Sequence, residues 1–416
     1  MAAENGKTYL KTLITAGLII SLSVVSINAF VDPYGILGAP EIQGFNRIKP
    51  QIPLHTRMVK AHKINKIRPK GLILGSSRAE VGLNPDHPGW AASSRPVYNA
   101  ALPSARIYEI YHYLRHAHSQ TSIAQVVLIL DFFSFDTGRR KESGFETERL
   151  RLEPGLIPNT GMIKDISTVL FSYDSLQASI DTLNHQNKPF YWYLSNGSRD
   201  AAYLQQQIED KGGHFKAFES VLTSALTAED GLVRFDYGHG NGKKTDVLKW
   251  FQNLVLFCAE EQIELYALIS PIHSQRLELL WQLGLWPTYE QWKRDVTHII
   301  EEIKKKGNLT TRIELWDFSG FNEISMERVP GVGNVLNRMD WYWEASHYKR
   351  RTGDLMLDRV LMGKRVDNIP EFGVRISIDG IESHLKAIRQ QRQRYAQARP
   401  EETEYLNTLI KDTLAL

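Results

Sequence analysis

The segment 125–135, QVVLILDFFSF, constrains the fold more than any other part of the sequence. Its apolar residues follow one another without alternating with polar residues. A strand with one face in water alternates between the two kinds, whereas a continuous β-prone run is typical of a strand covered on both faces. Such strands occur in parallel sheets flanked by helices, and we therefore expect an α/β fold.

Shorter apolar runs repeat along the chain and are separated by segments with helical periodicity. The other expected strands are GLIL (71–74), PVYNAAL (96–102), IELYALISP (263–271) and RIELWDFSG (312–320). Strands that alternate with helices imply a mostly parallel sheet with helices on both faces. The sequence thus predicts a three-layer α/β/α, flavodoxin-like domain, and its 416 residues leave room for additions.

The N-terminus carries an uncharged apolar segment, Leu13–Phe30, with Lys7 and Lys11 before it and Asp32 after it. A helix of about 20 apolar residues is long enough to cross a bilayer. Since the lysines precede the segment, the positive-inside rule places the N-terminus in the cytoplasm and the rest of the chain outside the inner membrane. We expect an uncleaved single-pass anchor in the bilayer through residues 13–30; the alternative is a cleaved signal peptide.

The chain is expected to divide into four parts. These are a cytoplasmic stub and transmembrane anchor (1–31), an approach segment with several prolines (32–70), the α/β domain (71–362) and a helical, arginine-rich tail (363–416). A proline- and glycine-rich helical insertion at 137–245 interrupts the strand pattern and is expected to be a lid or binding loop. The tail is either a solvated helix packed on the domain or a contact for a partner or anionic head groups.

Composition excludes several classes of site. A net charge of +3 is too small and too evenly spread to indicate nucleic-acid binding. Cys258 is the one cysteine, so no internal disulfide forms, and we expect a buried, inert thiol. No Cys/His cluster has the spacing of structural zinc.

Polar residues follow the ends of the expected strands. They are Ser76, Ser77, Asn99, Asp131, His273 and Asp317. In open parallel sheets, ligands bind at the carboxyl ends of the strands. A serine there becomes a nucleophile when a histidine takes its proton and a third group orients that histidine. The best candidate base is His347, with Glu344 three residues and Asp340 seven residues before it.

These residues carry a resemblance to a known family. Gly75-Ser76-Ser77 after the first strand, with Glu344-Ala-Ser-His347 near the end of an alternating chain, resembles the first and last blocks of the SGNH (GDSL-like) hydrolase superfamily over roughly residues 71–362, apart from the insertion. The resemblance implies Ser77 as nucleophile, His347 as base and Glu344 as its orienting group. The Gly-Ser-Ser opening is also similar to membrane-anchored accessory proteins of teichoic acid D-alanylation and exopolysaccharide O-acetylation, which work beside membrane-bound O-acyltransferases.

Two positions depart from the family pattern. The family places a glycine N–H and an asparagine side chain at the oxyanion site; here Ala101 and Asp131 occupy those places, with Asn99 as a further candidate. An ionised Asp131 would repel an oxyanion, and the loss of one donor typically costs about 10²–10³ in rate. Arg78 either steadies an anionic group or pairs with an acidic neighbour.

Two functions follow from these residues. The first is a serine O-acyl esterase or acyltransferase on a cell-envelope or exported glycan, with aromatic residues in FYWYL (190–194) and WYW (341–343) stacking on sugars and no cofactor required. The second is a non-catalytic scaffold that binds a glycan or docks an acyltransferase. In that case Ser77 is a helix cap and His347 a structural residue in an aromatic cluster.

Overall fold

The computed structural model of the protein describes residues 2–138, 143–153, 160–228, 231–238, 246–306, 311–335, 337–366, 369 and 371–415. Parts of the expected insertion, at 139–142, 154–159, 229–230 and 239–245, lie outside the described residues.

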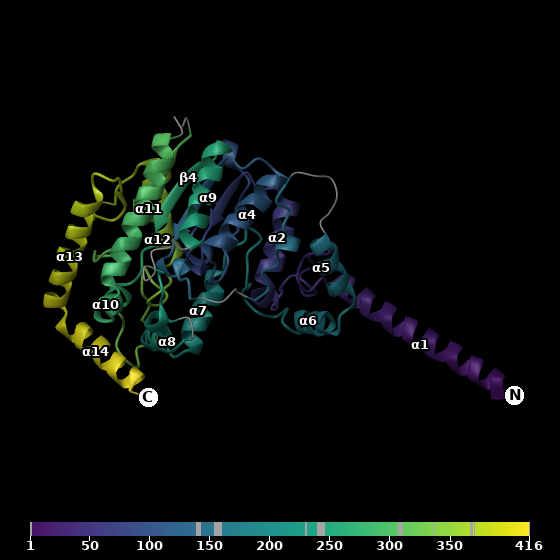
Figure 1. Cartoon of the computed structure of the whole chain (residues 1–416). Coiled ribbons are helices and arrows are strands. Elements are labelled where there is room, and N and C mark those ends of the chain that lie inside the picture. Colours follow the sequence, from purple (N-terminus) through teal and green to yellow (C-terminus); the bar gives the residue numbers. More distant parts are fainter. Residues whose placement is uncertain are drawn as a thin grey trace.

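A single sheet forms the centre of the molecule (Figure 1). Its strands are β1 (Gly71–Leu74), β2 (Val97–Asn99), β3 (Gln125–Leu130), β4 (Glu264–Ile269), β5 (Ile313–Asp317) and β6 (Val374–Arg375). They lie in the order β2-β1-β3-β4-β5-β6, and all neighbours are parallel except β5 and β6. Every residue of β3 is buried, as expected for its unbroken apolar run. The predicted α/β fold with a mostly parallel sheet is confirmed.

Helices connect the strands and cover the sheet. The α-helices are α1 (Ala2–Val31), α2 (Thr56–Ile67), α3 (Ser77–Gly82), α4 (Ile107–Gln120), α5 (Thr160–Phe171), α6 (Tyr173–Asn184), α7 (Ala201–Asp210), α8 (His214–Thr227), α9 (Asp246–Glu260), α10 (Ser274–Gln282), α11 (Trp286–Lys306), α12 (Arg350–Met362), α13 (Ile381–Ala398) and α14 (Pro400–Leu414). Short 3-10 helices span Ile52–His55, Ala92–Ser94, Phe132–Phe135, Thr147–Arg149 and Leu232–Arg234. Helices α2, α4, α9 and α11 lie side by side, each in contact with the next (Figure 1).

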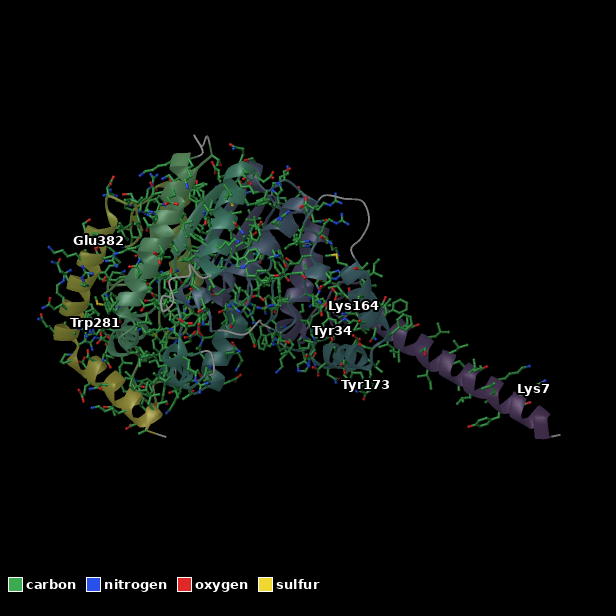
Figure 2. All side chains as sticks on the ribbon, viewed as in Figure 1. Lys7, Tyr34, Lys164, Tyr173, Trp281 and Glu382 are labelled. Carbon is green, nitrogen blue, oxygen red and sulfur yellow. The ribbon has the colours of Figure 1, made fainter. Side chains whose placement is uncertain are left out.

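Helix α1 projects from the rest of the molecule, with Lys7 near its far end and Tyr34 at its base (Figure 2). Within its segment Gly6–Val31, the most apolar stretch of 18 residues has a mean hydropathy of 2.1, so the helix is long and apolar enough to cross a membrane, a property that signal sequences share.

The base of α1 is held firmly in the domain. Asn28 Nδ2 donates to the Leu170 carbonyl over 3.1 Å, and Asn28 Oδ1 accepts from Ser179 Oγ over 2.9 Å. After the helix, the Asp32 carboxylate accepts the backbone N–H groups of residues 36–39. Lys49 Nζ donates to the Asp32 carbonyl over 2.6 Å. These contacts fix the turn that follows α1.

Segments expected to flank the domain are part of it. Residues 374–375 of the tail pair with β5, and the apolar face of α13 enters the core through Leu385, Ile388 and Tyr395. Arginines of the tail pair with acidic residues on α10 and α11, for example Arg392 with Glu278. The tail therefore packs on the domain, which was one of the two expectations for it.

The approach segment is also part of the domain. It contains α2, which adds Ala61 and Ile64 to the core.

Candidate active site

A glycine turn carries the chain from β1 into α3. Gly75 has φ +141°, and a Cβ on it would lie 3.0 Å from the Cβ of Ala79, the Cβ of Ile129 and the carbonyl oxygen of Ile129. No larger residue fits there without strain. Ser76 caps α3, since its Oγ accepts the Arg78 N–H over 3.3 Å. Ser77 is thus the first residue of the helix and stands beyond the carboxyl end of β1.

Three side chains form a hydrogen-bonded chain at this point. Ser77 Oγ lies 2.7 Å from His347 Nε2, and His347 Nδ1 contacts Glu344 Oε1. Because an ionised carboxylate only accepts hydrogen bonds, Nδ1 carries the ring proton and Nε2 is left to accept from the serine. This is the arrangement in which a histidine takes a proton from a serine hydroxyl. His347 stays in contact with solvent, with 29% of its side chain exposed.

The carboxylate of Glu344 is buried but remains ionised. Burial alone would raise its pKa, but the contacts with His347, the Ser346 N–H over 2.6 Å and the charge of Arg276 outweigh burial and hold the pKa of Glu344 below its ordinary value. A fixed anion behind the ring favours the imidazolium that would form when His347 accepts a proton.

Arg78 joins the serine turn to the histidine loop. Its Nε donates to the Ser346 carbonyl over 2.9 Å, and another guanidinium nitrogen donates to Ser346 Oγ over 2.7 Å. The third nitrogen pairs with Asp131, which also accepts from Ser76 Oγ. Arg78 therefore pairs with an acidic neighbour, one of the two roles expected of it. The charge of Asp131 is matched by Arg78 instead of facing an oxyanion unopposed.

A cavity of about 270 Å³ opens in front of Ser77 and His347. One wall comes from the β3 end and α10, with Asp131, Phe133 and Arg276. The opposite wall comes from the insertion and includes Val221, Ser224 and Ala225 of α8. The insertion therefore borders the candidate site, which agrees with its expected place at the active edge of the sheet.

The expected oxyanion donors on the β2 side are engaged elsewhere. The Ala101 N–H donates to Asn99 Oδ1 over 3.2 Å, while Asn99 Nδ2 donates to the Ala79 carbonyl over 2.9 Å. Both residues are buried and neither lines the cavity. The role proposed for them from sequence is thus corrected: Asn99 fixes the back of α3 to β2.

Three other candidates also lie outside the cavity. His273 caps α10 by accepting the Gln275 N–H and contacts the Glu327 carbonyl over 2.7 Å. Asp317 is buried against Lys293 and His384. Asp340 is exposed and faces Arg351, so it does not assist His347. These side chains follow strand ends or precede the histidine, but they serve capping and ion pairing.

Sequence reasoning missed several residues of the site. His273 was expected to be the polar group at the end of its strand. The cavity is lined instead by Arg276, three positions later, and not by His273. Ser104, also in the wall, has φ +55°, a conformation that non-glycine residues seldom adopt outside functional turns. The only sequence signal for Ser104 was its place after Pro103 in the β2–α4 turn.

The expected aromatic sugar platforms lie elsewhere. Tyr191, Trp192 and Tyr193 line a separate cavity of about 390 Å³ near residues 47–63, and Tyr342 is fully buried. Cys258 is buried as expected, and burial raises the pKa of its thiol. Within the described residues, no three His, Cys, Asp or Glu side chains gather as metal ligands would.

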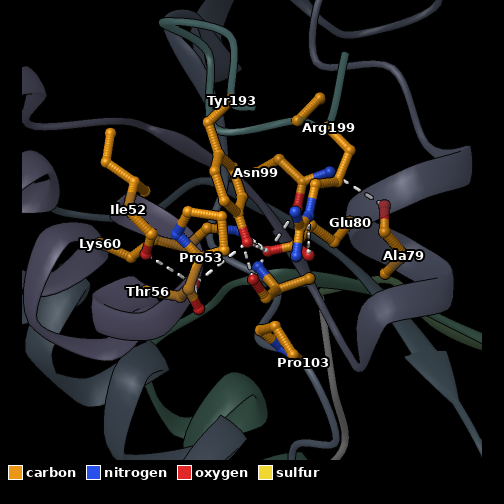
Figure 3. Close-up of polar contacts among 12 residues, drawn as sticks. Ile52, Pro53, Thr56, Lys60, Ala79, Glu80, Asn99, Pro103, Tyr193 and Arg199 are labelled. Carbon is orange, nitrogen blue, oxygen red and sulfur yellow. Dashed lines mark hydrogen bonds and ion pairs between the residues drawn. The ribbon is translucent and has the colours of Figure 1, made fainter. Parts of the chain in front are cut away.

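A cluster of charged residues around Glu80 holds α3 in place outside the cavity (Figure 3). Glu80, one turn after Ser77, accepts from Lys60 Nζ over 2.8 Å, from Tyr193 OH over 2.8 Å and from Arg199 Nε over 3.0 Å. Lys60 also donates to the Ala101 carbonyl. The cluster thereby ties α3 to α2, to the turn after β2 and to the insertion.

No family model and no curated protein matches this chain. The resemblance to SGNH hydrolases therefore stays a prediction, and the geometry of the site is its structural support.

Proposed function

We propose that the protein is a membrane-anchored serine O-acyl esterase or acyltransferase of the SGNH type that acts outside the cytoplasm on a cell-envelope or exported polysaccharide. The observation that carries the proposal is the chain from Ser77 Oγ through His347 to Glu344, open to a cavity at the carboxyl end of the sheet. A three-layer α/β/α arrangement of the domain belongs to the same proposal.

The proposed reaction has two steps. Ser77 Oγ attacks the carbonyl carbon of an O-acyl ester while His347 Nε2 takes its proton; the alcohol then leaves with that proton, and an acyl-serine remains. In the second step water or a glycan hydroxyl attacks the acyl-serine, again giving its proton to His347, and Ser77 is regenerated when His347 returns the proton to Oγ. Water as acceptor makes the protein an esterase, and a glycan hydroxyl makes it a transferase, with a membrane-bound O-acyltransferase as the proposed partner.

The place of action rests on the N-terminal segment. An apolar helix preceded by Lys7 and Lys11 supports an N-terminus in the cytoplasm and a catalytic domain outside the inner membrane. The proposed chemistry requires no cofactor, because Ser77, His347 and Glu344 supply the nucleophile, the base and its orienting group.

Activity-based labelling tests the proposal. The full chain in a neutral detergent is treated with a fluorophosphonate, which reacts with serines activated by a base. Labelling is expected to map to Ser77, to vanish in Ser77→Ala and to fall about 10³-fold or more in His347→Ala, because the serine then has no base. Glu344→Gln is expected to lose less, since His347 remains.

Ser76→Ala provides the matched control. It removes a neighbouring hydroxyl and a cap worth about 1 kcal/mol but leaves the proposed nucleophile in place, so labelling should persist. Labelling at Ser76 would contradict the assignment of the nucleophile. A folded chain that is not labelled at all, alone or with its acyltransferase, would instead favour the non-catalytic scaffold.

A further inference from the structure

One buried cation in the candidate site lacks a partner. Arg276 is 9% exposed and lines the same cavity as Ser77 and His347. Across the part of the chain that the structure describes, its side chain forms no ion pair, and its Nε–H has no hydrogen-bond acceptor. Its guanidinium lies against the ring of Phe133, whose centroid is 4.8 Å from the guanidinium carbon, and it feels the charges of Glu344 and Asp131 without contacting either carboxylate.

Three other buried cations among the described residues are paired with carboxylates. Arg78 contacts Asp131, Lys60 contacts Glu80, and Lys293 contacts Asp317. Burying a guanidinium without a counter-charge is unfavourable by several kcal/mol, so folding alone gives no reason for an unpaired arginine.

The acidic residues nearest to Arg276 are already committed. Asp131 is held by Arg78 and Ser76, and Glu344 by His347 and the Ser346 N–H. Burial, with a contribution from Arg78, lowers the pKa of Arg276 to about 10, so the group is still charged at neutral pH. The cavity therefore presents a preformed guanidinium fork with free donors.

We propose that Arg276 binds an anionic oxygen group, a carboxylate or a phosphate, on the glycan whose ester faces Ser77. The substrate class is then an acidic polysaccharide. This inference rests on the proposed function, because it takes the Ser77 cavity as the reaction site. A planar guanidinium binds carboxylate or phosphate oxygens through two parallel hydrogen bonds, which also orients the sugar toward the serine.

Binding measured without catalysis tests the inference. The full chain in neutral detergent at low salt is titrated calorimetrically with an oligogalacturonate, a glycerol phosphate oligomer and a neutral malto-oligosaccharide of matched length. We expect one of the two anionic ligands to bind at least tenfold more tightly than the neutral one. The identity of that ligand shows whether Arg276 prefers a carboxylate or a phosphate. Arg276→Met should weaken that binding about 10- to 100-fold, the value of one charge-assisted pair.

Two controls make the result specific. Arg294→Gln removes an exposed arginine of α11 that pairs with Glu382, and binding should not change. Arg276→Met should melt no lower than the native chain, because a buried unpaired charge is replaced by an apolar side chain of similar length. A lowered melting temperature with unchanged binding would overturn the inference in favour of a structural role.

The outcomes also separate this inference from the proposed function. Equal binding of neutral and anionic ligands, or unchanged binding in Arg276→Met, would overturn the anion subsite even if Ser77 is labelled normally. Anion binding that depends on Arg276 in a chain whose Ser77 is never labelled would support the subsite and remove the enzyme. If Arg276→Met lost rate equally on neutral and anionic esters while still binding them, Arg276 would act at the reacting carbonyl. That result would also overturn the inference.

A second inference rests on the surface beside the base of α1. Helices α5 and α6 pack on α1, and they expose a group of large apolar side chains to solvent. These residues are Ile163, Ile166, Phe171, Tyr173, Ile180 and Leu183. Figure 2 places Lys164 and Tyr173 on the side of the domain from which α1 departs. The exposed apolar surface of α1 itself continues to Phe30, next to these helices.

We infer that α5 and α6 lie in the interfacial region of the bilayer that α1 crosses. Single exposed apolar residues are normal, but six large ones on two helices that contact each other and α1 indicate a binding surface. Aromatic residues, aliphatic residues and a lysine on neighbouring helices are the composition of a membrane interface. Lipid is the occupant favoured here, because both helices pack on α1, whose apolar side chains are exposed as far as Phe30. The inference therefore rests on the proposed anchoring.

Spin labels on introduced cysteines test this contact, since Cys258 is fully buried and should not react. The full chain carrying Phe171→Cys, Leu18→Cys or Val332→Cys is reconstituted in phosphatidylcholine–phosphatidylglycerol vesicles. Val332 is the control because it is apolar and 72% exposed but lies in the loop after β5. Labels at positions 171 and 18 should be more accessible to oxygen than to a water-soluble nickel complex, and the label at 332 should show the reverse.

A label at 171 that behaves like the one at 332 would overturn the lipid contact. A label at 171 that neither reagent reaches would also overturn it, because another protein would then cover the patch. The label at position 18 distinguishes the lipid contact of α5 and α6 from the proposed anchor. If that label too is exposed to water, the anchor itself is wrong.

Discussion

Replacing Glu80 by glutamine would leave the buried Lys60 and the partly buried Arg199 without the carboxylate that they share (Figure 3). Glu80 is fully buried, and although burial alone would raise its pKa, the two cations together with Tyr193 hold the pKa of Glu80 below its ordinary value. Glutamine preserves the shape and one acceptor but removes the charge. Only the electrostatic part of the cluster is therefore perturbed.

The expected cost follows from what remains. Removing one member of a buried ion pair typically destabilises a protein by about 3–5 kcal/mol, because the other charge stays buried. Here two cations lose their partner, although Arg199 keeps contact with the Tyr193 ring at 4.4 Å. We expect a loss near the middle of that range, which lowers the melting temperature of a chain of this length by roughly 5 °C.

The assay is thermal unfolding of the full chain in detergent, compared with Glu382→Gln. Glu382 forms an exposed pair with Arg294, and such pairs contribute little, so this matched Glu→Gln change should leave the melting temperature almost unaltered. Fluorophosphonate labelling should also fall in Glu80→Gln, because Glu80 fixes the helix that begins at Ser77. A melting temperature within 2 °C of the native chain would refute the view that Glu80 neutralises a buried cluster.

Three further predictions concern the turn, the pH dependence and the topology. Gly75→Ala should destabilise the fold by about 1–3 kcal/mol and reduce labelling of Ser77, because φ +141° and the contacts with Ala79 and Ile129 leave no room for a Cβ; unchanged labelling and melting would contradict the described turn. Burial lowers the pKa of His273 to about 4, so the unfolded chain binds a proton that the folded one does not, and stability should decline by up to about 3 kcal/mol as the pH falls from about 6.5 to 4. His273→Asn, which can still cap α10, should lose less stability over this pH range, as measured by denaturant titrations at each pH. A pH profile identical to that of the native chain would contradict the role of His273. An alkaline phosphatase fused after the C-terminus should be active in cells, whereas an active cytoplasmic reporter at the same position would reverse the proposed topology.

The strands and the contact between Glu344 and His347 were predictable because local patterns determine them. The short, unbroken and β-branched run at 125–130 favours a covered strand, and Gly75 before two serines favours a tight turn. Glu344 and His347 are three residues apart, so a local turn is enough to bring them together. The five strands read from apolar runs were all found, whereas β6 has only two residues and too little pattern to detect.

What sequence could not supply was the direction of side chains at the strand ends. His273 and Arg276 follow the same strand, and the pitch of α10 decides that the histidine caps the helix while the arginine enters the cavity. Asp131 could not be judged until its pairing with Arg78 was visible, because the two are distant in sequence. The support of α3 by Lys60 and Arg199 likewise depends on long-range packing that no local pattern records.

The junction after α1 carries a consequence for reach. A soluble domain on a flexible linker explores a volume around its anchor that grows with linker length. Here Asn28, Asp32 and Lys49 leave no such linker, so the domain and its proposed anchor move as one stiff body. Ser77 would then work at one height above the bilayer and face one direction. If the proposed function is correct, an exported polymer would have to pass that point to be modified. The spacing of modifications along the polymer would then depend on the speed of export relative to the reaction rate, and not on diffusion of the domain.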